Sequence, residues 1–182
     1  TASAQVPRLD WTAAGAPDSA AWRLRNAQVD LAGTPSAMVL TTQAKAERDM
    51  QRFSVQAKAQ GGRGDGGSWS AQLDSAVFTM QDTRRAGVWT AQLKDRVAML
   101  WKQSGSAKTL EGSAGSLQLT GPVPGTATVA WQAARWTQTD LGGQPRSQWS
   151  TQGRFNDLPM AWLEPFSTTP WSQIGLKGDV LL

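Results

Sequence analysis

The side chains that could carry acid–base chemistry in this chain are its Asp and Glu residues, because the 182-residue sequence contains no His and no Cys. That absence excludes imidazole bases, thiol nucleophiles, disulfides and the commonest zinc ligands. Glycoside hydrolysis would need a pair of carboxylates. Nearly all of the 14 acidic residues fall in expected turns or at strand ends, where solvated loops place them by default. The sequence therefore predicts no catalytic residue, no metal site and no cofactor, and we expect that the chain is not an enzyme.

A glycine-rich stretch at 61–67, GGRGDGG, is the only segment that resembles a phosphate-binding loop. It lacks the Gly-Lys-Ser/Thr sequence of such loops and precedes an expected strand instead of a helix. We interpret it, including its Arg-Gly-Asp tripeptide, as a flexible connection. The net charge is +4, but the Lys and Arg residues are scattered along the chain. This distribution favours solubility and predicts no nucleic-acid partner.

Tryptophan is unusually frequent, with ten residues and no Tyr. In β proteins Trp can stack on sugar rings, lie at a membrane boundary or fill a core. Five of the ten occupy apolar positions of alternating segments, namely Trp22, Trp69, Trp89, Trp131 and Trp149. A sugar platform would instead place several Trp residues on a polar surface, so the pattern favours a structural or groove-lining role. Glycan or protein binding through exposed Trp residues such as Trp136 or Trp171 stays as the alternative.

Apolar and polar residues alternate through most of the chain, which predicts half-buried β-strands joined by short polar turns. A change of parity near Asn26 predicts a bulge or bend within the first strand. The spacing predicts about nine to eleven antiparallel strands, and no βαβ alternation is visible. Three architectures satisfy this pattern: a closed barrel, a two-sheet sandwich and an open, curled sheet. The expected strands lie at 22–31, 37–44, 53–59, 69–78, 89–93, 97–101, 117–119, 126–136, 148–155 and 174–182.

The one expected helical element follows the strand that ends at Phe155. Asn156 or Asp157 can cap a short apolar turn that Pro165 ends. Three apolar residues of this turn are candidates for capping one end of a groove: Met160, Trp162 and Leu163.

The expected organisation is an N-terminal extension or loop at 1–21 followed by one domain at 22–182. Because the chain starts without Met, we expect it to be a fragment of a longer protein. No signal-like segment is visible, and no run approaches the roughly 20 apolar residues of a membrane span.

A succession of motifs along the chain resembles a known family. In order they are GTPSAMVLTTQAKAE, RFSVQAKAQGG, SWSAQLDSAVFTM, GVWTAQLKDRVAML, GSLQLTG, QWSTQGRFNDLPMAWL and GLKGDVLL. Together they cover roughly residues 22–182 and resemble the C-terminal region of the TamB family of translocation and assembly module subunits. The individual motifs are degenerate, so the resemblance depends on their order and spacing.

The resemblance implies a long antiparallel sheet curled into an open groove with an apolar interior. It also implies a periplasmic segment of a protein anchored in the inner membrane, with an outer-membrane barrel partner of the Omp85 type. The cargo would be phospholipid acyl chains, unfolded strands of outer-membrane proteins, or both. We expect the groove to be lined by Phe53, Val55, Trp69, Leu73, Trp89, Leu93, Leu117, Leu119, Val129, Trp131, Trp149 and Phe155.

Two other interpretations stay open at this point. One is a β-sandwich binding module that uses exposed Trp residues. The other is a purely structural spacer whose inner face is filled by its own side chains.

Overall fold

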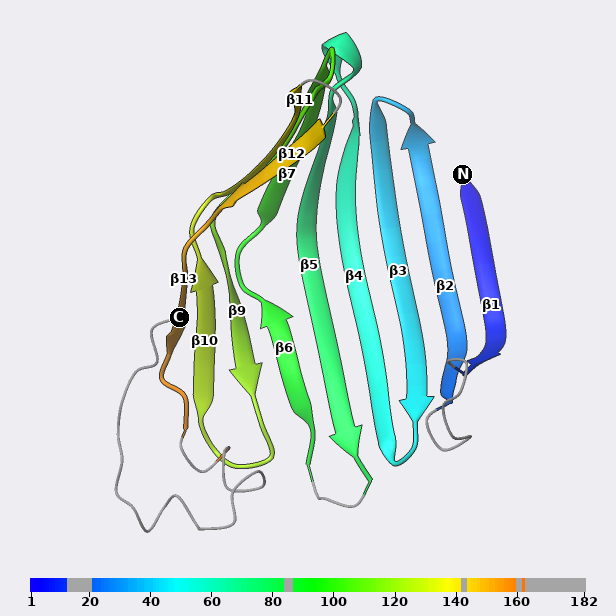
Figure 1. The fold of residues 1–182 in the computed structure, drawn as a ribbon. Helices are drawn as coiled ribbons and strands as arrows, with labels where there is room; N and C mark the ends of the chain where they lie inside the picture. Colours follow the sequence, from blue (N-terminus) through cyan, green and yellow to red (C-terminus); the bar gives the residue numbers. More distant parts are fainter. Residues whose placement is uncertain (13–20, 84–86, 142–143, 160–161, 163–182) are drawn as a thin grey trace.

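The fold is a single antiparallel sheet that is curved and open (Figure 1). The computed structural model describes residues 1–12, 21–83, 87–141, 144–159 and 162. Within them, thirteen strands pair into one sheet. The strands are β1 (Ala2–Trp11), β2 (Trp22–Thr34), β3 (Ala37–Arg48), β4 (Gln51–Arg63), β5 (Trp69–Asp82), β6 (Trp89–Leu93), β7 (Val97–Ser104), β8 (Ala107–Gly112), β9 (Gly115–Thr120), β10 (Thr126–Trp131), β11 (Ala134–Leu141), β12 (Gln144–Ser150) and β13 (Gly153–Asn156).

Strands β6 to β13 are four long strands that are each broken once. The breaks within β6–β7, β8–β9, β10–β11 and β12–β13 are only two or three residues long. The two halves of each long strand pair with the two halves of the next, so β7 pairs with β8 while β6 pairs with β9. The described part of the chain is therefore a meander of five whole and four broken strands, nine in all, which follow one another in sequence order.

The line of breaks begins in β5, where the register on β4 shifts beside Asp74. One extra residue on one strand is a β-bulge, which bends the sheet and increases its twist. Gln72 Nε2 donates a hydrogen bond of 2.7 Å to Asp74 Oδ1, and Arg96 Nε lies 3.7 Å from the same oxygen. On one side of this bulge β5 pairs with β7, and on the other side it pairs with β6.

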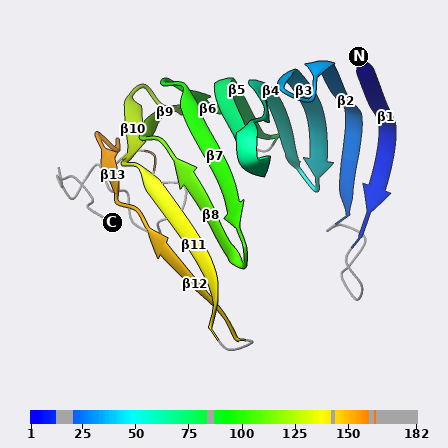
Figure 2. The same cartoon turned by 90° about the horizontal axis from the view of Figure 1, so that it is seen from above.

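Backbone hydrogen bonds cross the breaks of the neighbouring strands. Ser113 N–H donates to Ala98 O at 2.8 Å, and Gln132 N–H donates to Gln152 O at 2.9 Å. The Ser113 hydroxyl oxygen also accepts from Ala98 N–H at 3.0 Å. Because these groups stay paired, the sheet can bend along this line without leaving orphaned donors. Seen from above, β7, β8, β11 and β12 turn away from the row that β1 to β5 form (Figure 2).

The sheet does not close on itself. In the described part of the chain β1 pairs only with β2, and β13 pairs only with β10. The open, curled sheet is thereby confirmed, and the closed barrel and the two-sheet sandwich are wrong for these residues. Helical structure among them is limited to the 3₁₀ turn Asp65–Gly67 and a 3₁₀ turn at Trp162.

Several local predictions can be compared with the structure. The bulge expected near Asn26 is confirmed, because the register of β2 on β3 shifts between Arg25 and Gln28 and Asn26 has a φ of 48°. Within the expected N-terminal extension or loop, Ala2–Trp11 form the edge strand β1. Strand β8 was not predicted, because its sequence AKTLEG has one large apolar residue and no clear alternation. The expected strand at 174–182 lies outside the described residues.

Candidate functional site: the apolar face of the sheet

Residues directly opposite each other on antiparallel strands point to the same face of a sheet. The register therefore assigns every strand residue to one of two faces. One cross-strand row runs from Val55 through Phe78, Ala91 and Leu119 to Ala127. We call the face that carries this row the apolar face, and the opposite one the polar face.

All of the residues expected to line a groove lie on the apolar face, because the pairing connects each of them to this row directly or by even steps along a strand. They are Phe53, Val55, Trp69, Leu73, Trp89, Leu93, Leu117, Leu119, Val129, Trp131, Trp149 and Phe155. Their agreement across breaks and bulges means that the irregular positions preserve the apolar face instead of interrupting it. That they contact a cargo stays a prediction.

The structure adds apolar-face residues that the sequence did not single out. In β5 the bulge at Asp74 shifts the parity, so Phe78 and not Val77 continues the face of Leu73. In β7 the apolar face carries Met99, which is 41% exposed. Further additions are Val6, Leu9, Trp11, Leu31, Leu40, Met80, Trp101 and Leu110.

The apolar face is not covered by the described part of the chain. Among the described apolar side chains only Ala127 and Trp162 are buried, with 0% and 3% exposure. The large apolar-face residues that stay exposed are Val6, Leu9, Trp11, Val29, Leu31, Val55, Trp69, Phe78, Met99 and Trp149. A spacer whose inner face is filled by its own side chains does not fit these residues.

Two hollows lie on the apolar face. The upper one, at the end of the sheet that carries the β4–β5 turn (Figure 1), measures about 330 Å³. It extends from Leu31 on β2 to Leu110 on β8, with Trp69 and Met99 between them. The lower one measures about 370 Å³ and is lined by side chains that include Phe78, Trp89, Leu119, Phe155 and Trp162. Large side chains border both hollows, while small residues such as Ala59 and Ala91 form their floors.

Aromatic side chains from non-adjacent strands meet on this face. The rings of Trp22 on β2 and Phe53 on β4 are 5.3 Å apart, although β3 lies between them and places Ala46 there. Phe53 also contacts Phe78, at 6.1 Å between ring centroids. Because Ala46 on the central strand is small, the aromatic rings of the two flanking strands can contact each other above it.

Trp162 closes the lower end of the apolar face. Its ring packs edge-on against Trp89 at 5.0 Å and an interplanar angle of 86°, and its Nε1–H donates to Val123 O at 3.1 Å. Its backbone N–H donates to Pro159 O at 2.9 Å, which marks a 3₁₀-type turn. Of the expected cap, Trp162 thus lies over the face; Met160 and Leu163 lie outside the described residues.

Two glycines leave the space that the Trp162 turn occupies against the β9–β10 turn. A Cβ at Gly121 would lie 2.8 Å from Trp89 and 3.1 Å from Trp162, and a Cβ at Gly125 would lie 2.6 Å from Pro159. Gly125 also has a φ of 138°, which an L side chain rarely adopts. The β9–β10 turn must therefore be glycine-rich for the Trp162 ring to approach it.

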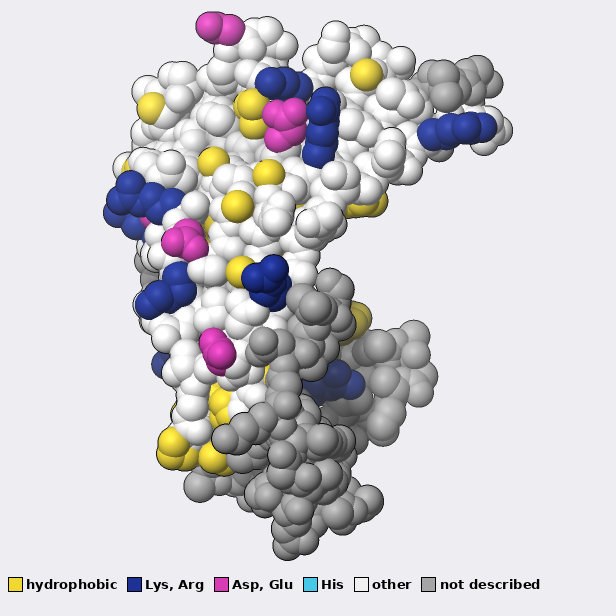
Figure 3. Space-filling model, turned by 90° about the vertical axis from the view of Figure 1, so that its left-hand side faces the viewer, with side chains coloured by type: hydrophobic (Ala, Val, Ile, Leu, Met, Phe, Trp, Pro, Cys, Tyr) yellow, Lys and Arg dark blue, Asp and Glu magenta, His cyan; other side chains and the backbone are white. Residues whose placement is uncertain are grey.

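Most ionisable side chains of the strands lie on the polar face, whereas Arg48, Arg63 and Lys108 lie near strand ends on the apolar face. Arg135 and Lys102 both approach Glu111, at 3.7 Å and 4.0 Å, and such exposed pairs contribute little to stability. Viewed from the side of β13, Lys and Arg side chains lie beside Asp and Glu, with small separate apolar areas (Figure 3). At the other edge Arg8 donates hydrogen bonds to Asp10; this bond, followed by the charge, lowers the pKa of the Asp10 carboxyl.

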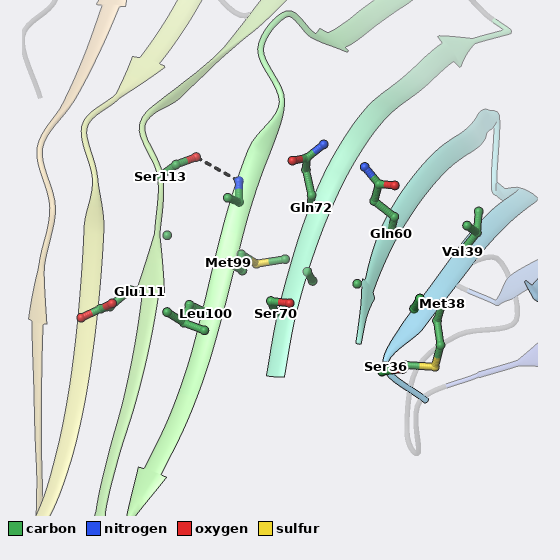
Figure 4. A pocket seen from close by; sticks show the side chains of 15 residues that line it. Ser36, Met38, Val39, Gln60, Ser70, Gln72, Met99, Leu100, Glu111 and Ser113 are labelled. Atoms are coloured by element: carbon green, nitrogen blue, oxygen red, sulfur yellow. Dashed lines mark hydrogen bonds between the residues drawn. The ribbon is translucent and has the colours of Figure 1, made fainter. Parts of the chain in front are cut away.

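A hollow of about 670 Å³ also lies on the polar face, between β3 and β8. Its lining mixes amides such as Gln60 and Gln72 with apolar Val39 and Leu100. Gln60, Gln72 and Val39 project from the polar side of their strands, and Met38 projects from the apolar side (Figure 4). Because its lining has neither one polarity nor a set of converging charges, this hollow is a weaker candidate site than the apolar face.

No arrangement for metal chemistry is present in the described ranges, where no cluster of three or more His, Cys, Asp and Glu side chains could hold an ion. Within the same ranges no helix is long and apolar enough to cross a membrane. The fold and the site together define an open β-sheet protein with one uncovered apolar face. No family model, no curated protein and no solved structure matches the chain.

Proposed function

We propose that this chain is the groove-forming segment of a TamB-like periplasmic protein whose parent is anchored in the inner membrane. Its apolar face takes up phospholipid acyl chains on their way between the inner and outer membranes. The observation that carries the proposal is the exposure of large apolar side chains on one continuous face, such as Phe78 at 43% and Trp69 at 44%. A contiguous exposed apolar face is typical of surfaces that bind another apolar partner.

The physical reason favours an acyl chain as the occupant. Each methylene that leaves water for an apolar surface contributes about 0.8 kcal/mol. Covering even four methylenes therefore contributes about 3 kcal/mol. An acyl chain is also thin and flexible, so it can follow a face whose hollows are lined at intervals by large side chains.

A second candidate cargo is an unfolded strand of an outer-membrane protein, delivered to an Omp85-type barrel. The observation that favours it is the edge strand β1, which is exposed along its whole length and pairs with β2 alone among the described strands. An exposed sheet edge can accept an added strand through its free backbone groups.

The test compares two carboxylates placed on neighbouring residues of β10. Val129 lies on the apolar face, opposite Leu117 and Phe155, whereas Thr128 lies on the polar face, opposite Gln118 and Asn156. We expect Val129→Asp to lose phospholipid that native mass spectrometry detects on the purified wild-type protein. Thr128→Asp, which adds the same charge one residue away, should retain it.

The opposite pattern would contradict the proposal, as would a wild-type protein that carries no phospholipid after incubation with phosphatidylethanolamine and phosphatidylglycerol. A cellular assay extends the test. Leu119→Asp should obstruct lipid passage while expression stays near normal, and normal transport in that variant would show that Leu119 does not line the path.

A further inference from the structure

The upper end of the apolar face carries a cross-strand row of tryptophans. Trp69 pairs directly with Trp101, and Leu110 connects Trp101 to Trp136, which pairs with Trp149. The rings of Trp101 and Trp136 stack at 5.9 Å and 17°, and Trp149 lies 6.1 Å from Trp136. We call these four residues the tryptophan row.

The tryptophan row is accessible at both ends. Trp149 is 68% exposed and Trp69 is 44% exposed. The described part of the chain therefore leaves indole surface open. Three of the four residues lie on β7, β11 and β12, which turn away with β8 from the row of β1 to β5 (Figure 2).

The composition of the apolar face changes on the two sides of this row. Towards the middle of the sheet the next positions are apolar or small, such as Met99, opposite Gly112, and Ala134. Towards the strand tips the next row is polar: Lys108 pairs with Gln103 on one side and with Gln138 on the other, and Gln138 pairs with Ser147. Along one face the order is thus apolar, aromatic and then cationic or amide.

That order matches the layers of a lipid surface. Trp is enriched where hydrocarbon meets headgroups, because its ring is apolar and its N–H is polar. Lys beyond it can reach lipid phosphates while its methylene stem stays on apolar surface. Arg63 supplies a second cation at the level of the row, since it pairs with Trp69.

We propose that the tryptophan row and Lys108 form a membrane-docking end, which lies on the headgroup region of an anionic phospholipid surface and aligns the apolar face with its hydrocarbon. This inference rests on the proposed function for the source of the acyl chain. It adds the place at which the chain would enter or leave, and it assigns that place to the end of the sheet opposite Trp162.

The absence of Cys allows a direct test. A single cysteine at Gln103→Cys, beside Lys108, carries an environment-sensitive fluorophore at the docking end. A second protein carries it at Met50→Cys, in the exposed turn between β3 and β4 at the other end. With vesicles of phosphatidylcholine and phosphatidylglycerol, we expect a blue shift and vesicle co-sedimentation for the label at 103, and no shift for the label at 50.

Matched substitutions separate charge from aromatic contact. Lys108→Glu should weaken binding to anionic vesicles by about fivefold or more, whereas Lys45→Glu, the same charge change at an exposed polar-face position of β3, should weaken it less. Trp149→Ala should lose binding to neutral and anionic vesicles alike. Val39→Ala, which shortens a 39% exposed apolar side chain on the polar face, should not.

The inference would be overturned by wild-type protein that does not bind these vesicles, by a shift at position 50 instead of 103, or by equal effects of the matched substitutions. Binding of soluble oligosaccharides that Trp149→Ala abolishes, without vesicle binding, would also overturn it and identify the row as a sugar platform. A protein that retains phospholipid in native mass spectrometry but fails to dock would refute the docking end alone. One that docks but never retains lipid would refute the proposed function alone.

Discussion

Replacing Trp162 by Ala tests whether the lower end of the apolar face is closed by a weakly held cap. Burial of a Trp side chain removes about 200 Å² from water, which at about 25 cal/mol per Å² stabilises the contact by about 5 kcal/mol. The edge-on contact with Trp89 and the hydrogen bond to Val123 O each add about 1 kcal/mol.

The opposing term is conformational entropy. Fixing the backbone of a residue costs about 1–2 kcal/mol, so ordering Asp157, Leu158, Pro159 and Trp162 alone costs about 4–8 kcal/mol. The stabilisation from Trp162 burial and its contacts therefore nearly equals the entropy cost of ordering the turn. The cap is therefore expected to open readily, and removing the indole should release it while the sheet stays folded.

The assay has two parts. Hydrogen exchange of the Trp162 backbone amide, which is bonded to Pro159 O, reports opening, and titration with a fluorescent fatty acid reports access to the lower hollow. Trp162→Ala should remove protection of that amide and tighten fatty-acid binding, because the ligand no longer competes with the indole for Phe78, Trp89 and Leu119. Val39→Ala, which shortens an exposed apolar side chain on the polar face, is the control. Unchanged or weaker binding in Trp162→Ala, with the sheet intact, would refute the cap as a competitor of the ligand.

Three further predictions concern the sheet itself. Gly115→Val should destabilise the protein by about 1–3 kcal/mol in urea unfolding, because a Cβ there would lie 2.6 Å from Trp131 and 2.8 Å from Val97. Gly112→Ala, where the nearest atoms would lie 3.9 Å away, should be tolerated, and equal losses would refute the packing explanation. Asp74→Ala should cost about 1 kcal/mol and speed amide exchange in β7, since it removes the bond from Gln72 and the charge near Arg96; unchanged exchange would show that the bulge does not depend on that carboxylate. Arg8→Ala should raise the pKa of Asp10 towards its ordinary value of 3.8 in an NMR titration. Because the Arg8 contact lowers that pKa, the pair is intact at higher pH and is lost as the Asp10 carboxyl protonates; an unchanged titration would contradict this.

The sequence predicts the membership of the apolar face well, for a physical reason. A strand with one apolar and one polar face must alternate, and a displaced register would move every apolar side chain to the other face. Trp89, Ala91 and Leu93 therefore show their face without any knowledge of their neighbours. The bulge at Asn26 was predictable for the same reason, since it is visible as a change of parity between Leu24 and Ala27.

The elements that escaped prediction lack this local signal. Strand β8 is held by pairing with β7 and β11, and only Leu110 within it is large and apolar. In β1 the alternation changes parity at Pro7, between Val6 and Leu9. The segment therefore lacks a continuous strand pattern in the sequence. The breaks within the long strands are also invisible locally, because the curvature that they allow is a property of the whole sheet.

The closeness of residues from different strands could not be derived from spacing. Trp101 and Trp136 stack only because β8 connects them and the sheet curves between β7 and β11. The same holds for Trp162 and Val123, whose contact depends on the path of the chain after β13. Sequence patterns therefore predict which side chains share a face, whereas their clustering depends on topology.

Methyl NMR with a spin-labelled phospholipid tests the central claim most directly, because both faces contain native probes. Leu73, Leu119 and Val129 lie on the apolar face, whereas Val39 and Val77 lie on the polar face. If acyl chains bind the uncovered apolar face, paramagnetic broadening should affect the methyl signals of Leu73, Leu119 and Val129. The methyl signals of Val39 and Val77 should stay sharp. Equal broadening on both faces, or broadening of Val39 and Val77 alone, would contradict it.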